Sequence, residues 1–353
     1  MKIGIVTIYN SQNCGSFLQA YALTNYINSL GHDTALVRNN MYYKNKFLYR
    51  STMALKYLLK LDFKKAKTIF DTYRGFVKAR KKYSYFDKSE AFDLCIFGSD
   101  TIWNIDGEYF DEEYKHYFGV DFNCNKITYA ASVGPTDIDN ILSNEEMCKG
   151  LKEFDAVSVR DDKTFELIKK VTGKEAEYVV DPTMLMPKSF YEDVAEFCPD
   201  EKYILFYCFE AIENDMLDEI KKFAKEKGLK LICFGDRITG CQKQLIFNPI
   251  LMMTYYKNAS FVVTDTFHGN VFSLIFNKPF INIERGKEKV TSLLKKFDLF
   301  QRTAKEAGDV ADIVQSEIDF DIFNEKLNQN SQSSKKYLDN EITKSERRKN
   351  NAC

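Results

Sequence analysis

The fold of this chain is indicated most clearly by SFVVTDTFHGNVFSLIFNK, residues 260–278. Residues 260–263 form an apolar run typical of a buried strand, and residues 272–276 carry the apolar side chains of a helix face. The short polar turn between them contains His268. A strand that passes through such a turn into a helix places the turn at the carboxyl edge of a parallel sheet, where open α/β proteins bind ligands. The stretch therefore predicts a parallel sheet with a binding site around His268.

His268 is one of only three histidines in the 353 residues. An imidazole beside the exposed N–H groups of a helix start suits acid catalysis on an anionic substrate. The alternative is that the ring only packs against the turn or caps it. Its position favours the catalytic role.

Strands and helices alternate along most of the chain in two series, which join near residues 181–200. Alternation of this kind predicts βαβ units and parallel sheets. The fold class that follows is α/β, with two Rossmann-like domains facing a cleft. The expected strands are at residues 2–8, 34–37, 93–97, 127–131, 156–159, 178–180, 203–208, 229–234, 260–263 and 279–283.

Three segments follow from these series. Residues 1–186 are expected to form the N-terminal domain, with a helical insertion at about 44–86, and residues 187–310 the C-terminal domain, which carries the His268 turn. Residues 311–353 are expected to form a helical segment whose tail is frayed from Lys344 onward.

Composition excludes several classes of protein. A hydrophobic content of 44% with 29% charged residues is ordinary for a globular chain, and a formal net charge of −1 argues against nucleic-acid binding. The nine cysteines include no CxxC pair, which favours reduced side chains over a disulfide frame or a metal site. The sequence contains neither the apolar core of a secretory signal nor a run long enough to span a membrane. We therefore expect a soluble cytoplasmic protein without a bound metal.

The helical insertion carries a basic surface between residues 64 and 82. Such a run is most often a solvated helix face. The alternative is peripheral contact with phospholipid headgroups or with an anionic lipid-linked substrate.

The usual phosphate-binding fingerprints are missing, since no GxGxxG follows the first strand and no GxxxxGK[ST] occurs. Compact polar turns follow the predicted strands instead, so they are expected to converge on one cleft. Each turn alone is weak evidence, because small residues suit any tight connection. These turns are NCGS (13–16), GSD (98–100) leading to Trp103 and Asn104, ASVG (131–134), SVRD (158–161) and the His268 turn.

These turns, taken in order, resemble the polysaccharide pyruvyl transferase family from the N-terminus to about Leu299. The motifs that carry the resemblance are NCGS (13–16) with LQAYAL (18–23), FGSDTIWN (97–104), YAASVG (129–134), SVRD (158–161), VDPT (180–183) and TDTFHGNVFS (264–273). The resemblance implies a GT-B-like fold, phosphoenolpyruvate as the donor co-substrate, no separate cofactor, and a saccharide acceptor that is lipid-linked or nucleotide-linked.

The resemblance also implies roles for particular residues. His268 is expected to be the acid, with Asp100 and Asp265 as candidate bases, although either Asp could instead cap a helix. The expected donor-binding residues are Arg160, Thr266, Gly269, Asn270, Arg285 and Lys289. The expected acceptor or cleft-loop residues are Asn13, Gly15, Ser16, Gln19, Ser99, Trp103, Asn104 and Ser132.

Arg160 has an alternative role, an ion pair with Asp161, Asp162 or Asp181. The sequence also departs from the Arg-Leu-His of many family members, because Thr266 and Phe267 precede His268. The missing cation would have to come from Arg285, Lys287 or Lys289.

The function implied is transfer of a pyruvyl group from phosphoenolpyruvate to a saccharide, forming a pyruvate ketal in surface-polysaccharide synthesis. Two alternatives stay open: a GT-B glycosyltransferase that uses a nucleotide-sugar, and a non-catalytic sugar- or phosphate-binding protein of the same fold.

Overall fold

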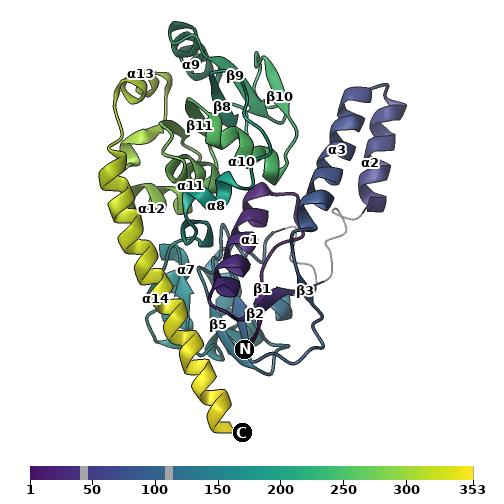
Figure 1. Cartoon of the computed structure of the whole chain (residues 1–353), viewed down its shortest axis with the longest axis vertical. Helices are drawn as coiled ribbons and strands as arrows, with labels where there is room; N and C mark the ends of the chain where they lie inside the picture. Colours follow the sequence, from purple (N-terminus) through teal and green to yellow (C-terminus); the bar gives the residue numbers. More distant parts are fainter. Residues whose placement is uncertain (40–46, 108–113, 353) are drawn as a thin grey trace.

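The computed structural model describes residues 1–39, 47–107 and 114–352, and it contains two parallel sheets, one above the other in Figure 1. The first sheet has the order β3-β2-β1-β4-β5, and the second has the order β10-β9-β8-β11-β12-β13. In the first sheet the strands are β1 Lys2–Val6, β2 Asp33–Val37, β3 Tyr85–Phe86, β4 Leu94–Phe97 and β5 Asn125–Thr128. In the second they are β8 Tyr203–Tyr207, β9 Lys230–Phe234, β10 Lys243–Leu245, β11 Phe261–Thr264, β12 Phe280–Ile283 and β13 Thr303–Ala304.

A short parallel pair, β6 (Ser158–Val159) and β7 (Glu177–Tyr178), continues the first sheet. Isolated bridges from Ile127 to Ala156 and from Ala131 to Val159 connect it to the region of β5. The helices are α1 Cys14–Ser29, α2 Phe47–Leu59, α3 Phe63–Arg80, α4 Tyr114–Tyr117, α5 Ile138–Leu142, α6 Glu145–Lys152, α7 Asp162–Thr172, α8 Lys188–Glu192, α9 Asn214–Glu226, α10 Pro249–Asn258, α11 Phe267–Ile275, α12 Glu288–Lys296, α13 Ala307–Gln315 and α14 Phe320–Ala352.

Each sheet reverses its strand order beside its first strand. The reversal lies between β1 and β4 in one sheet and between β8 and β11 in the other. Crevices form outside the carboxyl ends of strands at such switch points. The expected α/β architecture with two Rossmann-like halves is therefore confirmed, and its two switch points fix where a ligand site should be sought.

The two halves share one apolar core. A single cluster of buried side chains includes Ile3 and Leu18 of the first half together with Tyr207, Val262 and Phe272 of the second. A large apolar interface of this kind restricts relative motion of the two halves. The strands of the first sheet and of its short extension precede residue 187, and those of the second lie between 187 and 310.

α14 runs back from the second half across the first, along one side of the molecule in Figure 1. Tyr337 Oη donates to the carbonyl of Thr128 at 3.0 Å, and Lys349 Nζ lies 3.0 Å from Asp93. The frayed tail expected from Lys344 is wrong, because the helix continues to Ala352 and its last turns form ion pairs with the first half.

The insertion is a hairpin of α2 and α3 that stands beside the body in Figure 1. The prediction of helices was right for most of it, but residues 85–86 pair with β2 as strand β3 instead. Residues 44–46 of the expected insertion lie outside the described residues. The strands β10 and β13 were not predicted, because they are three and two residues long and carry no clear period.

In the part of the chain that the structure describes, no helix is long and apolar enough to cross a membrane.

Candidate functional site

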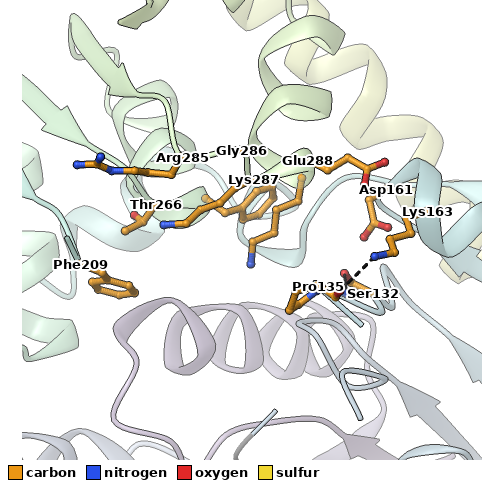
Figure 2. A pocket seen from close by; sticks show the side chains of 13 residues that line it. Ser132, Pro135, Asp161, Lys163, Phe209, Thr266, Arg285, Gly286, Lys287 and Glu288 are labelled. Atoms are coloured by element: carbon orange, nitrogen blue, oxygen red, sulfur yellow. Dashed lines mark hydrogen bonds between the residues drawn. The ribbon is translucent and has the colours of Figure 1, made fainter. Parts of the chain in front are cut away.

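A cavity of about 550 Å³ opens between the carboxyl edges of the two sheets (Figure 2). The first half contributes the turn after β5 and the start of α7, and the second half contributes the turns after β8, β11 and β12. Its lining residues are Ser132, Gly134, Pro135, Asp161, Lys163, Phe209, Thr266, Phe267, Arg285, Gly286, Lys287, Glu288 and Lys289. The cavity therefore occupies the place that the two switch points predict.

The turn after β11 is built by short side-chain bonds to the backbone. Thr266 is the N-cap of α11, and its hydroxyl accepts from Gly269 N at 2.9 Å. A side chain at Gly269 would lie only 2.0 Å from the hydroxyl of Thr264. Asn270 is fully buried and donates both to the Thr266 carbonyl and to Asn282, each at 2.9 Å. Of these residues only Thr266 lines the cavity, whereas Gly269 and Asn270 shape the turn, and donor binding by these two stays a prediction.

His268 lies behind this turn and not in the open cavity. Its ring packs on the backbone of Gly15, where an added Cβ would be 2.1 Å from Nδ1. Its Nε2 lies 3.6 Å from Asp181 Oδ2. Gly15 was expected in an acceptor loop, but its role in the structure is to make room for the imidazole.

Arg160 holds two carboxylates beside His268. Its Nη1 donates to Asp181 Oδ2, and its Nη2 lies 3.5 Å from Asp100 Oδ1. The side chain of Arg160 is 2% exposed and that of Asp181 is fully buried. Ser16, expected at the acceptor side, donates its hydroxyl to Asp100. The cluster is thus an ion-pair network assembled from both halves of the chain.

The network keeps both carboxyl groups ionised. Burial alone would raise the pKa of Asp181, but the neighbouring His268 and Arg160 outweigh burial and hold that pKa well below its usual range. Burial likewise opposes ionisation of Asp100, yet Arg160 and then Lys289 lower its pKa. The alternative of an Arg160 ion pair with Asp181 is therefore correct, and Asp100 is held too tightly by cations to be a strong base.

Several donors of this network make no hydrogen bond in the described residues, although two of them lie in the ion pairs with Asp100 and Asp181. Arg160 Nε and Nη2 and His268 Nε2 are buried, and none has a hydrogen-bond partner within the described chain. Leaving a buried donor unpaired costs about 1–3 kcal/mol, more for a charged group. Two donors of one guanidinium beside an imidazole N–H suit an anion with several oxygens.

Phe267 separates the network from the cavity. The Arg160 guanidinium carbon lies 4.8 Å from the centre of this ring, and Lys289 Nζ lies 5.7 Å from it. Phe267 also lines a second cavity of about 370 Å³, together with Arg160 and Asp181. Phe267 is thus a wall shared by two cavities, with a cation over its ring from each half of the chain.

Lys289 is the cation most available to a ligand. No ion pair or hydrogen bond of its ammonium group is found in the described residues, and burial together with Arg160 lowers its pKa. Arg285, in contrast, donates to the Ala211 carbonyl and lies 3.3 Å from Glu213. Lys287 donates to the Asp265 carbonyl at 3.0 Å and lies 3.4 Å from Glu210. Lys289 therefore fits the position of the missing cation better than the other two.

Asp265 is not a free base. Its two oxygens accept from the backbone N–H groups of Phe209 at 2.9 Å and Glu210 at 3.0 Å, and the residue is 1% exposed. It fixes the loop after β8, so its expected catalytic role is wrong for a physical reason: both acceptors are used.

Asp161 was missed as a candidate base. It caps α7, with Oδ1 accepting from Thr164 N at 2.9 Å, while its Oδ2 has no hydrogen-bond partner in the described residues. It also lines the cavity. The SVRD motif contains this residue, but an Asp between a strand and a helix most often serves as the N-cap of the helix, so the sequence did not single it out as a base.

Four polar residues of the first half hold loops and do not line the cavity. Asn13 caps α1 by accepting from Gly15 N at 2.8 Å. Gln19 donates to Thr7 at 3.0 Å and accepts from the Ser99 hydroxyl at 3.0 Å, and both Gln19 and Ser99 are fully buried. Asn13, Ser16, Gln19 and Ser99 are thus engaged within the chain, and their contact with an acceptor stays a prediction.

The expected cleft residues that follow β4, Trp103 and Asn104, do not line the cavity either. Trp103 is fully buried and donates Nε1 to the Tyr117 carbonyl at 3.0 Å, which makes it a core residue. Asn104 accepts from the Thr136 hydroxyl at 2.9 Å and does not line the cavity. Only Ser132 of the expected cleft-loop residues contributes to the lining, beside Pro135 in Figure 2.

Comparison with known proteins agrees with the motifs. The family model described as polysaccharide pyruvyl transferase matches residues 13–287. No curated protein sequence matches the chain.

Solved structures with a similar fold are UDP-N-acetylglucosamine 2-epimerases. One such epimerase has a TM-score of 0.54 at 9% identity, and the alignment covers 95% of this chain and 93% of the epimerase chain. The enzyme from Rickettsia bellii has a TM-score of 0.52 at 12% identity, and the alignment covers 98% of this chain and 96% of the enzyme. The enzyme from Neisseria meningitidis, bound to UDP-GlcNAc, has a TM-score of 0.51 at 8% identity, and the alignment covers 97% of this chain and 100% of the enzyme. These similarities show that the fold is GT-B.

Proposed function

The chain belongs to the polysaccharide pyruvyl transferase family, a family of transferases, and we propose that it transfers the pyruvyl group of phosphoenolpyruvate to a saccharide. The product is a pyruvate ketal, and phosphate is released. We place the reaction in the cytoplasm, in the synthesis of a cell-surface or exported polysaccharide. One observation carries the proposal: buried N–H donors of Arg160 and His268 that make no hydrogen bond within the described residues lie near Lys289, whose ammonium group has no ion pair there, at the junction of the two halves.

The donor would be held by its two anionic ends. Phosphoenolpyruvate has a carboxylate and a phosphate, and a guanidinium binds such groups through parallel hydrogen bonds. Arg160 Nε and Nη2 make no hydrogen bond within the described residues, so they are proposed to bind one anion, with Nη2 exchanging its 3.5 Å ion pair with Asp100 for the donor. Lys289, 5.7 Å from the centre of the Phe267 ring, supplies charge for the second. Thr266 lines the same wall of the cavity.

His268 is the proposed acid. It gives a proton from Nε2 to the methylene carbon of the donor, which forms a C–H bond and makes the adjacent carbon electrophilic. Asp181, 3.6 Å away, stabilises the protonated imidazole before the transfer. The ring must reach the donor past the Thr266–Phe267 turn, so the reacting carbon is proposed to lie at the edge of the network.

Asp161 is the proposed base. One saccharide hydroxyl attacks the electrophilic carbon and its proton passes to the base; the second hydroxyl then displaces phosphate. Of the two hydroxyl protons, one replaces the proton that His268 gave and the other leaves with phosphate. Asp161 Oδ2 is a buried carboxylate oxygen of a residue that lines the cavity, and it has no hydrogen-bond partner in the described residues.

A second candidate function is glycosyl transfer from a nucleotide-sugar. Phe209 favours it, because this aromatic ring lines the cavity after β8 and is 40% exposed, which leaves a face free for stacking. The same ring could instead pack on the apolar face of the acceptor saccharide. A protein that binds donor without turnover is the third outcome.

Donor binding tests the proposal. Phosphoenolpyruvate should raise the melting temperature of the native protein, and Arg160→Lys should abolish most of that shift, because Lys keeps the charge but not the paired donors. Arg237→Lys, at an arginine outside the cavity lining, is the matched control. Equal shifts in all three proteins would refute the donor site, and a shift produced only by nucleotide-sugars would favour the second function.

A further inference from the structure

The α2–α3 hairpin exposes an unusual amount of apolar surface. Leu48, Leu55 and Leu59 of α2 are 74%, 55% and 79% exposed. Their spacing of seven and four residues places them on one helix face. That face points to solvent, whereas Ala54 is buried. α2 is therefore apolar on a side that is mostly exposed to solvent.

The apolar surface continues around the turn between the helices. Leu61 is 75% exposed and Phe63 is 64% exposed. We call Leu55, Leu59, Leu61 and Phe63 the hairpin tip. In Figure 1 the turn that joins α2 to α3 is the outer end of the hairpin, away from the first sheet.

Basic side chains surround the hairpin tip. Residues 47–82 contain eleven Lys and Arg but only two Asp and Glu, although the whole chain has a formal net charge of −1. The exposed cations are Lys56, Lys60, Lys64, Lys65, Lys67, Arg74, Lys78, Lys81 and Lys82. Few are neutralised: Lys67 pairs with Asp71 and Lys78 pairs with Glu196. The positive charge of the molecule is thus concentrated where its apolar surface is also exposed.

The base of the hairpin is fixed to the body. Phe76 and Ala79 of α3 are fully buried at this base, and at the other end of α3 Lys64 Nζ donates to Gln244 Oε1 of β10 at 2.7 Å. Gly75 packs closely on the side chain of Asn248, the N-cap of α10. The hairpin tip is therefore presented from a rigid support and is not a loose loop.

We propose that the hairpin tip docks on an anionic lipid bilayer. Its Leu and Phe side chains enter the boundary between headgroups and acyl chains, and the surrounding lysines bind headgroup phosphates. A bilayer surface offers both an apolar phase and anionic charge in one plane, as interfacial amphipathic helices require. A second copy of the chain would bring the same positive charge and repel, and a nucleic acid would offer no apolar phase.

The inference is independent of the chemistry proposed above, because vesicle binding requires neither donor nor acceptor. It accords with a lipid-linked acceptor, which would be met at the same surface.

Vesicle flotation tests the proposal. The native protein should float with vesicles of phosphatidylcholine and phosphatidylglycerol, and much less with phosphatidylcholine alone or at high salt. Leu55→Ser/Leu59→Ser/Leu61→Ser should reduce binding at least about tenfold, and Lys56→Gln/Lys60→Gln/Lys65→Gln should do the same, since each surface cation contributes about 1 kcal/mol.

The controls carry the same changes elsewhere. Ile322→Ser removes an apolar side chain that is 65% exposed on α14, and Lys222→Gln/Lys225→Gln/Lys227→Gln removes two exposed lysines of α9 and the exposed lysine at its C-cap. Both controls should bind like the native protein. The proposal is overturned if the native protein stays with the soluble fraction, or if tip variants and controls bind alike. It is also overturned if light scattering without lipid shows a dimer that the serine variant abolishes, because a second copy would then cover the tip.

Discussion

The substitution Gly15→Ala should impair catalysis without unfolding the protein. The added methyl carbon would lie 2.1 Å from His268 Nδ1 and 2.4 Å from Cγ. Non-bonded carbon contacts are normally about 3.5 Å or longer, so the ring must move by roughly 1 Å. A displacement of that size at a catalytic group costs on the order of 10²-fold in rate. The expected loss therefore lies in turnover.

Stability should change little in this variant. Gly15 lies in the first turn of α1 and its φ is not in the left-handed region, so Ala suits its backbone, and any loss of stability comes from the shift of the buried His268 ring alone. Gly308→Ala is the matched control, because nothing lies within 4 Å of its added methyl group. Turnover per folded molecule and melting temperature should be measured for both. If Gly15→Ala turns over at the native rate, His268 does not need its observed position, and the acid assignment is refuted.

Four further outcomes are expected. His268→Gln should lower turnover by roughly 10²–10⁴-fold while phosphoenolpyruvate still raises the melting temperature, and normal turnover in the folded variant would exclude the acid role. Lys289→Met should weaken donor binding more than Arg285→Met, because the Arg285 guanidinium is already engaged by Ala211 and Glu213. The melting temperature measured at increasing phosphoenolpyruvate concentration gives both affinities, and the opposite order would mean that Arg285 holds the donor. Asp181 and Asp100 have folded-state pKa values below their unfolded values, so the stability that they contribute is present above about pH 4 and is lost as pH falls through the folded values. Asp181→Asn should therefore reduce the loss of folding stability at acid pH. An unchanged loss at acid pH would contradict the network. Burial raises the pKa of Cys14 to about 12, so iodoacetamide at pH 8 should label exposed Cys198 and leave Cys14 unlabelled in the folded protein, as peptide mapping can check.

The sequence was sufficient for the main architecture. Apolar runs such as Tyr203–Tyr207 and Phe261–Thr264 are long enough to show a strand, and each is followed by a clear helix start. Pairs such as Thr303–Ala304 carry no period, because two residues cannot show one. The end of α14 was misjudged because its polar composition gives no sign of the ion pairs with Asp93 and Asp155.

The site was predicted in position but only partly in roles. Strand ends identify which turns meet, and Arg160, Thr266 and Lys289 were found in this way. A short polar residue at a strand end, however, can face the ligand or bond its own backbone. Asn13 accepts from the nearby Gly15 N, and Asp265 accepts from Phe209 N and Glu210 N of a distant segment. Asp161 accepts from Thr164 N with one oxygen, and its other oxygen has no hydrogen-bond partner in the described residues. That choice depends on backbone N–H groups brought in from other segments, such as Phe209 N, which no local pattern reveals.

The central claim is pyruvyl transfer from phosphoenolpyruvate, and phosphate release in the presence of candidate saccharide acceptors measures it most directly. The account predicts release that depends on an acceptor with two suitably placed hydroxyls, equals the amount of pyruvate ketal found by mass spectrometry, and is lost in His268→Gln. If phosphoenolpyruvate yields no phosphate with any acceptor while a nucleotide-sugar is consumed with release of its nucleotide, the account is contradicted and the chain is a glycosyltransferase of the same fold.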